Sequence, residues 1–291
     1  MKGKKSPRTH TYPLWFYLPA AGFFLVLFIF PTLASFFFSL TRWTLSDWQF
    51  IGLDNYFSFF GETFLVQGLY NTIFYSVFTT IAKVVIGIFL AVWLTSGVFG
   101  QSYLRAVVFF PVLVSTVGVG ITFKTLMKPF DGLINTSLSI FGIEGPQWLA
   151  DPSLALFSVA LVDVWKGVGI ATVIFIAGLA AIPQEYREAA IVDGAGGVKR
   201  FLYVTWPLLM PATSTVIILA LIGGLRSFDL IWAMTGGGPG FASDVLASLV
   251  FKQFQAGFYG LSTAGNVVLF FLVAFIVFPL SRFLNKRIVE Y

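Results

Sequence analysis

The sequence contains no cysteine and only one histidine, His10. The absence of cysteine excludes disulfides, iron–sulfur clusters, thiolate metal sites and a cysteine nucleophile. A lone histidine in a basic N-terminal tail supplies neither a histidine metal site nor a histidine-based triad. The chain also lacks the Gly-x-x-x-x-Gly-Lys-Ser/Thr phosphate loop, so we do not expect it to hydrolyse ATP. Most classes of enzyme are therefore excluded.

Charge is also scarce. Only 11% of the 291 residues are charged, whereas 57% are hydrophobic and the mean hydropathy is +0.88. Water-soluble domains carry about 25% charged residues, so the composition predicts an integral membrane protein. The net charge of +5 would suit a nucleic-acid partner, but its distribution along the chain indicates membrane topology instead, and no nucleic-acid partner is expected.

Long stretches without Asp, Glu, Lys or Arg define the membrane spans. They predict an all-α integral membrane protein with six transmembrane helices, at about 14–38, 70–95, 105–126, 154–181, 207–232 and 262–281. The first apolar run follows a basic tail, as in a signal peptide. It is too long, however, and no small-residue cleavage site ends it, so we expect an uncleaved anchor.

Lys and Arg predict the orientation of these spans. With the N-terminus inside, the inner segments hold 11 of them and the outer segments hold three. Because Lys and Arg concentrate in cytoplasmic loops, both termini are expected to be cytoplasmic. The predicted organisation is a cytoplasmic tail over 1–13, a transmembrane permease domain over 14–281 with an inner loop at 183–206, and a cytoplasmic tail over 282–291.

Two pairs of opposite charges lie within the predicted spans. Asp163 and Lys166 are three residues apart, as are Arg226 and Asp229, so each pair can share one helix face and neutralise itself. A lone charge at the centre of a span costs about 2.5–3.5 kcal/mol on insertion scales. Two interpretations stay open: the pairs border a hydrated solute pathway, or they only neutralise each other. Lys83 has no partner at helical spacing and is expected to turn into the bundle rather than to mark a pathway.

Glycines accompany both charged pairs. Gly167 and Gly169 predict a close helix crossing, which we favour over a direct binding role. Gly223 and Gly224 could mark an unwound point where backbone carbonyls face a cavity.

The inner loop is predicted to form a helix, a break and a second helix. Pro183 suits the first turn of a helix, and Gly194 suits a left-handed cap that ends it. Ile191 and Val192 are apolar groups on a cytoplasmic loop, which could fill a groove on a partner protein. The alternative is a helix that rests on lipid headgroups, and the residues alone slightly favour that alternative.

Resemblance to a known family changes this balance. The segment Glu188-Ala-Ala-x-x-Asp-Gly-Ala195, followed by Phe201 and Pro207, resembles the EAA loop of binding-protein-dependent ABC importer permeases. Four further segments resemble landmarks of the carbohydrate-uptake branch of this family and of its maltose-type first permease. They are Gly52-Leu-Asp-Asn-Tyr56, Trp148-Leu-Ala-Asp-Pro152, Trp165-Lys-Gly167 and Thr235-Gly-Gly-Gly-Pro239. The resemblance covers nearly the whole chain from about residue 14. It implies a type I ABC importer permease fold in a bacterial-type cytoplasmic membrane.

The resemblance implies that the EAA loop forms a coupling helix, which docks in a cleft of a separate cytoplasmic ATPase. Closure of the ATPase dimer would then switch a central cavity between inward-facing and outward-facing states. The residues that take this ATPase-coupling role by resemblance are Glu188, Ala189, Ala190, Asp193, Gly194 and Ala195. No cofactor is expected on this chain, whereas the partner ATPase would use ATP and Mg.

The resemblance also implies solute contacts from the fourth and fifth spans, at Lys166, Gly167, Ile170, Ala220, Gly223, Gly224 and Ser227. Most of these residues are small or apolar, which departs from a sugar site built on hydrogen bonds and ring stacking. With the charged positions added, the predicted substrate pathway comprises Asp163, Lys166, Gly167, Ile170, Gly223, Gly224, Arg226, Ser227 and Asp229. The outer segment 236–240 is expected to form a turn rather than to contact a docked binding protein.

The sequence thus predicts a transport subunit, not an enzyme, of an ATP-driven ABC importer for a sugar delivered by an extracytoplasmic solute-binding protein. Its expected partners are a second homologous permease, two ABC ATPase subunits, that binding protein and membrane lipid. The same importer class acting on glycerol phosphate or another polyol-type solute is one alternative, in which Arg226 would bind the anion. An ion-coupled secondary carrier with Asp163 and Asp229 as ion sites is the other.

Overall fold

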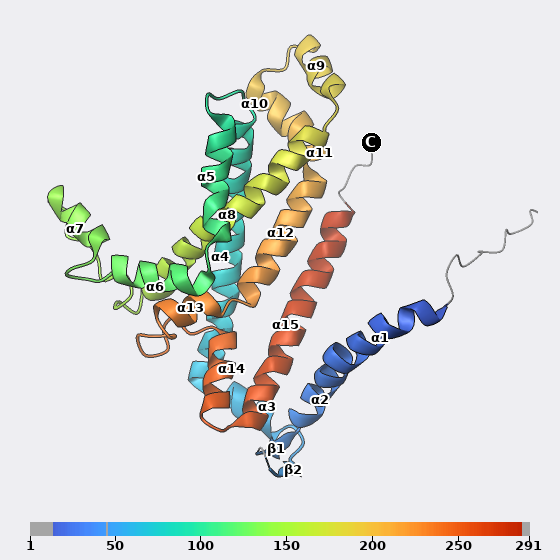
Figure 1. The fold of residues 1–291 in the computed structure, drawn as a ribbon, viewed down its shortest axis with the longest axis vertical. Coiled ribbons are helices and arrows are strands. Elements are labelled where there is room, and N and C mark those ends of the chain that lie inside the picture. Colours follow the sequence, from blue (N-terminus) through green and yellow to red (C-terminus); the bar gives the residue numbers. More distant parts are fainter. Residues whose placement is uncertain (1–13, 45, 287–291) are drawn as a thin grey trace, which may run out of the picture.

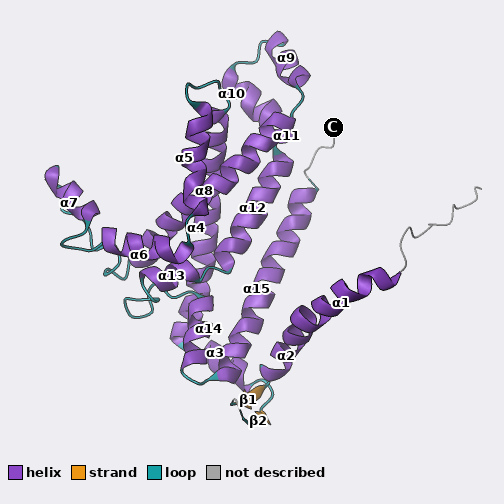
Figure 2. Cartoon of the chain, viewed as in Figure 1, coloured by secondary structure: helices purple, strands orange, loops and turns teal. Residues whose placement is uncertain are grey.

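A computed structural model describes residues 14–44 and 46–286 as an almost wholly helical chain (Figures 1 and 2). The N-terminal tail at 1–13, with His10, and the end of the C-terminal tail at 287–291 lie outside the described residues. In chain order the helices are α1 (Leu18–Phe24), α2 (Phe30–Phe38), α3 (Asp54–Gly61), α4 (Thr63–Leu94), α5 (Gln101–Leu113), α6 (Thr116–Leu126), α7 (Leu133–Ile140), α8 (Ala155–Ala181), α9 (Gln184–Val192), α10 (Gly197–Arg200), α11 (Trp206–Leu208), α12 (Met210–Leu225), α13 (Asp229–Met234), α14 (Leu246–Gln255) and α15 (Tyr259–Asn285).

Among the described residues, four helical segments are long and apolar enough to cross a membrane by length and composition. They are Trp15–Phe38, which includes α1 and α2, and the single helices α4, α8 and α15. Two bent pairs of helices are also long and apolar enough to cross a membrane when each pair is taken as one span. These pairs are α5 with α6, and Gly197–Leu208 with α12. These segments overlap the charge-free runs of the sequence, and α4 and α8 also carry Lys83, Asp163 and Lys166.

Two of the helices predicted from the sequence, at 105–126 and 207–232, are each interrupted by a bend in the structure. The α5–α6 pair bends by 96°, and the pair that leads into α12 bends by 70°. Proline has no backbone N–H and clashes with the preceding turn, so it kinks or ends a helix. Pro111 lies in the last turn of α5, and Pro207 and Pro211 flank the second bend. Pro207 and Pro211 account for the second bend. The first break lies after Pro111, at residues 114–115, whereas a proline disturbs the turn that precedes it, so Pro111 does not explain that bend.

Helix α4 lies at the centre of the bundle and packs against α8 and α12 (Figure 1). Its buried face is made largely of small and polar residues: Gly68, Asn71, Thr72, Ser76, Thr79, Thr80, Lys83, Gly87 and Ala91. Small side chains let membrane helices approach closely. A Cβ on Gly87 would lie 2.8 Å from the Ala171 Cβ, and one on Gly169 would lie 2.6 Å from the Val108 carbonyl oxygen. The close helix crossing predicted at Gly169 is confirmed, between α8 and α5.

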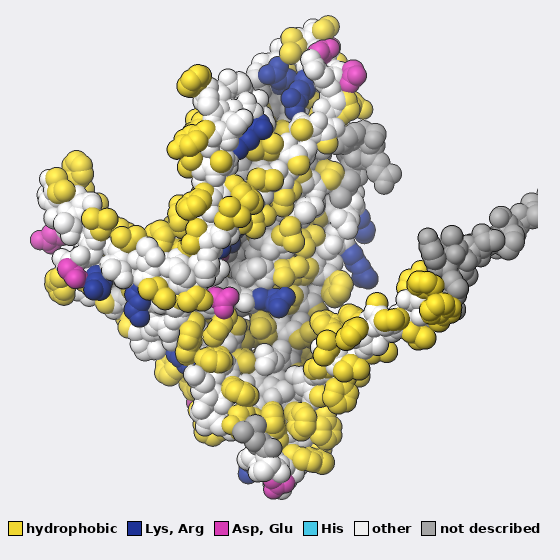
Figure 3. Space-filling view, viewed as in Figure 1, with side chains coloured by type: hydrophobic (Ala, Val, Ile, Leu, Met, Phe, Trp, Pro, Cys, Tyr) yellow, Lys and Arg dark blue, Asp and Glu magenta, His cyan; other side chains and the backbone are white. Residues whose placement is uncertain are grey.

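The segment Trp15–Phe38 leaves the bundle and is exposed along most of its length (Figures 1 and 3). Its end is joined to the bundle by the hairpin of β1 (Thr41–Trp43) and β2 (Trp48–Phe50), paired antiparallel with Arg42 opposite Gln49. The buried Asn55 amide donates to the Ser39 and Thr41 carbonyls at 2.8 and 2.9 Å. The Gly52–Tyr56 landmark thus fixes the chain reversal after the first apolar helix.

Candidate functional site: a cavity and two loops

A cavity of about 250 Å³ lies among α4, α8 and α12, close to the α5–α6 bend. Five of the predicted pathway residues line it: Asp163, Lys166, Gly167, Ile170 and Gly223. The remaining lining residues are Lys83, Val112, Thr116, Ala171, Ile174, Val216, Leu219 and Ala220. The cavity is therefore an apolar chamber with a few polar groups, which is the usual composition of a small-molecule site.

The main polar feature of this cavity is an ion pair between two helices. The Lys83 Nζ donates to Asp163 Oδ2 at 2.7 Å, and the two side chains are 10% and 22% exposed. This geometry corrects the predicted neutralisation of Asp163 by Lys166, because Asp163 pairs with Lys83 of α4 instead. Lys83 turns into the bundle as expected. Contrary to expectation, it also lines the cavity that the predicted pathway residues share.

Lys166 also lines the cavity and is partly buried, yet the described residues form no ion pair with it. Gly167 lies directly under the Lys83 side chain, because a Cβ there would be 2.6 Å from Lys83 Cε and 3.0 Å from Nζ. The wall of the cavity consequently carries two lysines and one carboxylate.

The other predicted pathway residues lie beside the cavity, where α12 ends. The predicted pairing of Arg226 with Asp229 on one helix face is wrong, because α12 ends at Leu225 and α13 begins at Asp229. Both side chains are exposed, and no ion pair joins them in the described part of the chain. Ser227 lies in the break and donates to the buried Tyr75 hydroxyl at 3.3 Å.

The break in the fifth predicted span lies just beyond the two glycines, not at them. Gly223 and Gly224 are both helical, and a Cβ on Gly224 would lie 2.6 Å from the Ser76 Cα. Gly224 therefore permits a close approach of α12 to α4, whereas Gly223 borders open space. The unwound point predicted at these glycines lies instead at residues 226–228.

The inner loop forms the predicted helix, break and second helix. Helix α9 ends at Val192, Gly194 is left-handed with φ +74°, and α10 begins at Gly197. The Gly194 N–H donates to the Ile191 carbonyl, and the Ala195 N–H donates to the Ala190 carbonyl at 2.9 Å. These bonds satisfy carbonyls that the end of α9 would leave unpaired.

Helix α9 lies at the end of the bundle opposite β1 and β2 (Figure 1). Several Lys and Arg side chains gather at the α9–α10 end (Figure 3).

Most residues of the proposed coupling segment are exposed. Ala190 is buried, but Ile191 and Val192 are 57% and 86% exposed, and Glu188, Ala189, Asp193 and Gly194 are also exposed. The Arg187 guanidinium donates to the Leu179 carbonyl at 2.7 Å and so ties α9 to the end of α8. The loop is held at its base and presents apolar side chains to the outside.

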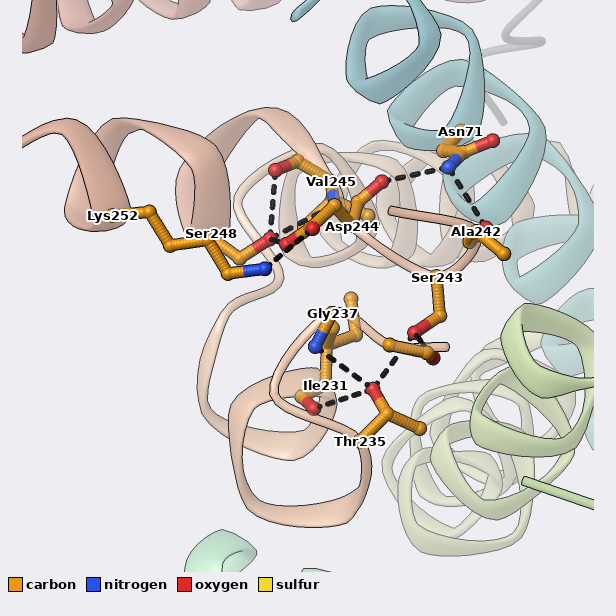
Figure 4. Close-up of polar contacts among 11 residues, drawn as sticks. Asn71, Ile231, Thr235, Gly237, Ala242, Ser243, Asp244, Val245, Ser248 and Lys252 are labelled. Atoms are coloured by element: carbon orange, nitrogen blue, oxygen red, sulfur yellow. Dashed lines mark hydrogen bonds and ion pairs between the residues drawn. The ribbon is translucent and has the colours of Figure 1, made fainter. Parts of the chain in front are cut away.

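The outer loop at 235–245 connects α13 with α14 and has the opposite character (Figure 4). Its predicted glycine turn is confirmed, with Gly236, Gly237 and Gly240 left-handed. Asp244 is fully buried and accepts from Lys252 Nζ at 2.6 Å and from the Ser248 hydroxyl at 2.7 Å. The Asn71 amide donates to the Ala242 and Asp244 carbonyls, which fastens the loop to α4.

Sequence reasoning missed Lys83, Asp244 and Lys252 as paired groups. Their partners are too far away in sequence to be found from helical spacing. Lys83 and Asp163 are 80 residues apart, and Lys252 and Asp244 are eight residues apart. A signal existed only for Lys83, which is the single charge between two long uncharged runs. In the described part of the chain, no three His, Cys, Asp or Glu side chains gather closely enough to hold a metal ion.

Comparisons with known proteins agree with these features. The family "binding-protein-dependent transport system inner membrane component" matches residues 83–290. The trehalose/maltose transport system permease protein MalF of Thermococcus litoralis is 35% identical over 258 residues, 88% of each chain. The multiple sugar-binding transport system permease protein MsmF of Streptococcus mutans is 32% identical over 265 residues, 90% of this chain and 91% of MsmF.

A solved bacterial ABC transporter that imports the acidic polysaccharide alginate has the same fold, with a TM-score of 0.83 and 20% identity over 94% of each chain. The matched family region includes the cavity, the inner loop and the outer loop. The chain therefore belongs to the family of inner-membrane components of binding-protein-dependent transport systems.

Proposed function

We propose that this chain is the permease subunit of an ATP-driven ABC importer that translocates a sugar delivered by an extracytoplasmic solute-binding protein. It crosses the membrane six times, with both termini in the cytoplasm. A second, homologous permease subunit and two ATPase subunits complete the importer. ATP and Mg are used by the ATPase, since this sequence lacks a phosphate loop.

The observation that carries this proposal is the exposed inner loop. Ile191 and Val192 lie on an ordered helix–break–helix whose base is fixed by Arg187. Apolar side chains held in this way fit a groove on a protein partner. In the proposed role Glu188, Ala189, Ala190, Asp193, Gly194 and Ala195 form the contact that couples ATPase closure to the spans.

The solute pathway is proposed to run along the cavity at Asp163, Lys166, Gly167, Ile170 and Gly223, and past Gly224, Arg226, Ser227 and Asp229. The exposure of Arg226 and Asp229 supports this course. Charged side chains within a membrane face a hydrated cavity or a protein partner rather than lipid. The second permease would close the pathway on this side.

Lys166 favours one second candidate, an anionic polyol such as glycerol phosphate. An ammonium group without an ion-pair partner among the described residues could bind the phosphate of such a solute. The alternative of an ion-coupled carrier is weakened, because Asp163 is neutralised by Lys83 and needs no transported cation as its counter-charge.

Transport by the reconstituted importer tests the proposal. The permease pair and ATPase are placed in liposomes with the binding protein outside and ATP inside, and uptake of labelled maltose, trehalose and glycerol 3-phosphate is measured. We expect uptake of at least one sugar, and none when ATP or the ATPase is omitted. Uptake that persists without the ATPase and follows a proton or sodium gradient would contradict the importer and favour the carrier. Uptake of glycerol 3-phosphate alone would support the second candidate.

A further inference from the structure

The Lys83–Asp163 pair lies on the wall of the cavity, not within the packed core away from it. Both residues line the cavity, and the Asp163 side chain is the more exposed of the two, at 22%. A carboxylate offers about four lone-pair sites. The Lys83 ammonium occupies one of them, and the neighbouring Tyr75 hydroxyl interacts with the same carboxylate. Asp163 therefore keeps acceptor capacity on the cavity side.

Stability alone does not explain this pair. A buried ion pair is often no more stabilising than apolar residues of the same volume, because removing both charges from water is costly. The rest of the lining is mostly apolar, with Ile170, Ile174 and Leu219 among it. Small-molecule sites combine such walls with a few fixed polar groups that set orientation. The pair adds a fixed hydrogen-bonding group to predicted solute contacts that are mostly small or apolar.

We propose that Lys83 is a positioning residue that holds the Asp163 carboxylate at the cavity wall as an acceptor for hydroxyl groups of the transported sugar. This inference rests on the proposed function and adds a residue of the second apolar helix to a pathway expected from the fourth and fifth alone. The pair itself has no net charge and presents Asp163 to hydroxyl groups, while Lys166 adds one positive charge to the same wall.

Gly167 is the second element of this arrangement. Its missing side chain leaves the space in which the Lys83 methylenes lie, since a Cβ would meet Lys83 Cε at 2.6 Å. The end of a lysine side chain is flexible, so an added methyl group would displace the ammonium rather than the helix backbone. Gly167→Ala should therefore loosen the pair while keeping both charges.

The test compares single and double substitutions in the reconstituted importer with labelled maltose and trehalose. Lys83→Met and Asp163→Leu each leave one buried charge unpaired, so either variant can fail to assemble. The double variant Lys83→Met/Asp163→Leu leaves no unpaired charge and should assemble with its partners. We expect its uptake rate to stay about tenfold to a hundredfold below wild type, the loss caused by removing a hydrogen bond to a charged acceptor.

A merely structural pair would give the opposite result, because uptake would recover together with assembly in the double variant. Gly167→Ala provides an independent readout and should also lower uptake with assembly unchanged. Its matched control is Gly118→Ala on α6, which is not part of the cavity lining. There the added Cβ would lie 3.7 Å from the Ser115 Cβ, an ordinary van der Waals contact. We expect wild-type uptake from this control.

The outcomes separate the inference from the function on which it rests. Wild-type uptake by an assembled double variant, or by Gly167→Ala, would overturn the role of Lys83 and leave the importer intact. Uptake of glycerol 3-phosphate alone by the unmodified complex, or uptake that persists without the ATPase, would overturn the sugar importer and the inference together.

Discussion

The inner loop at 183–206 and the outer loop at 235–245 lie at different levels of the same bundle (Figure 1). They differ in how closely their glycines are packed. Both contain left-handed glycines between helices, Gly194 in the inner loop and Gly237 in the outer loop. A Cβ on Gly194 would meet nothing within 4 Å, whereas one on Gly237 would strike the Asp244 carboxylate. The outer loop is thus packed around a buried charge, and the inner loop presents its turn to open space.

This difference indicates what each loop needs for stability. The outer loop satisfies its polar groups against neighbouring helices, because Asp244 bonds Ser248 and Lys252 of α14 and its carbonyl accepts from Asn71 of α4 (Figure 4). The inner loop leaves Val192 86% exposed, although the loop itself is ordered by backbone bonds at its break. An ordered loop with exposed apolar side chains is what a docking surface requires, and a loop whose polar groups are satisfied is what a structural support requires.

The largest effect on stability is expected from Asp244→Ala. This change leaves the Lys252 ammonium and the Ser248 hydroxyl without their shared acceptor. The Lys252 side chain left behind is 27% exposed, so we expect the loss of a charged hydrogen bond, about 1.5–3 kcal/mol. The thermal midpoint of the purified complex should fall accordingly. Lys128→Ala is the matched control, because the Lys128–Asp131 pair is 51% and 75% exposed and such pairs contribute about 0–1 kcal/mol. Equal effects of the two changes would contradict the supporting role of Asp244.

A smaller effect is expected from Gly237→Ala, and it compares the loops directly. Alanine in the left-handed region costs about 1–2 kcal/mol in either loop. In the outer loop the new Cβ must also displace the Asp244 carboxylate. Gly194→Ala is the control that has the backbone cost alone, since its surroundings are open. The thermal midpoint should therefore fall further for Gly237→Ala than for Gly194→Ala, and the reverse order would refute the contrast between the loops.

The sequence predicted the helical class and the positions of the apolar helices, because uncharged runs long enough to span lipid are rare outside membrane helices. It also predicted the left-handed break at Gly194, where glycine chemistry and the flanking helix formers agree. These are local features, determined by neighbours along the chain.

Features that depend on contacts between helices could not be predicted in this way. Asp163 has Lys166 at helical spacing, yet it pairs with Lys83 on another helix. The sign of a charge indicates that a partner is needed, but spacing identifies candidates only on the same helix. Asp244 was missed because loops are expected on the surface, and its full burial follows from packing of α14 against α4.

Co-purification of the ATPase with the permease tests the central claim most directly. Wild type is compared with Glu188→Lys and Gly194→Asp, both in the exposed part of the inner loop. Glu188→Lys should change stability little, as exposed substitutions usually do, and Gly194→Asp adds only the backbone cost of its left-handed turn, so the membrane subunits should assemble in both variants. We predict that the bound ATPase is lost from both variants. An ATPase retained equally by wild type and both variants, or absent from wild type, would contradict the assignment of this loop as the coupling element.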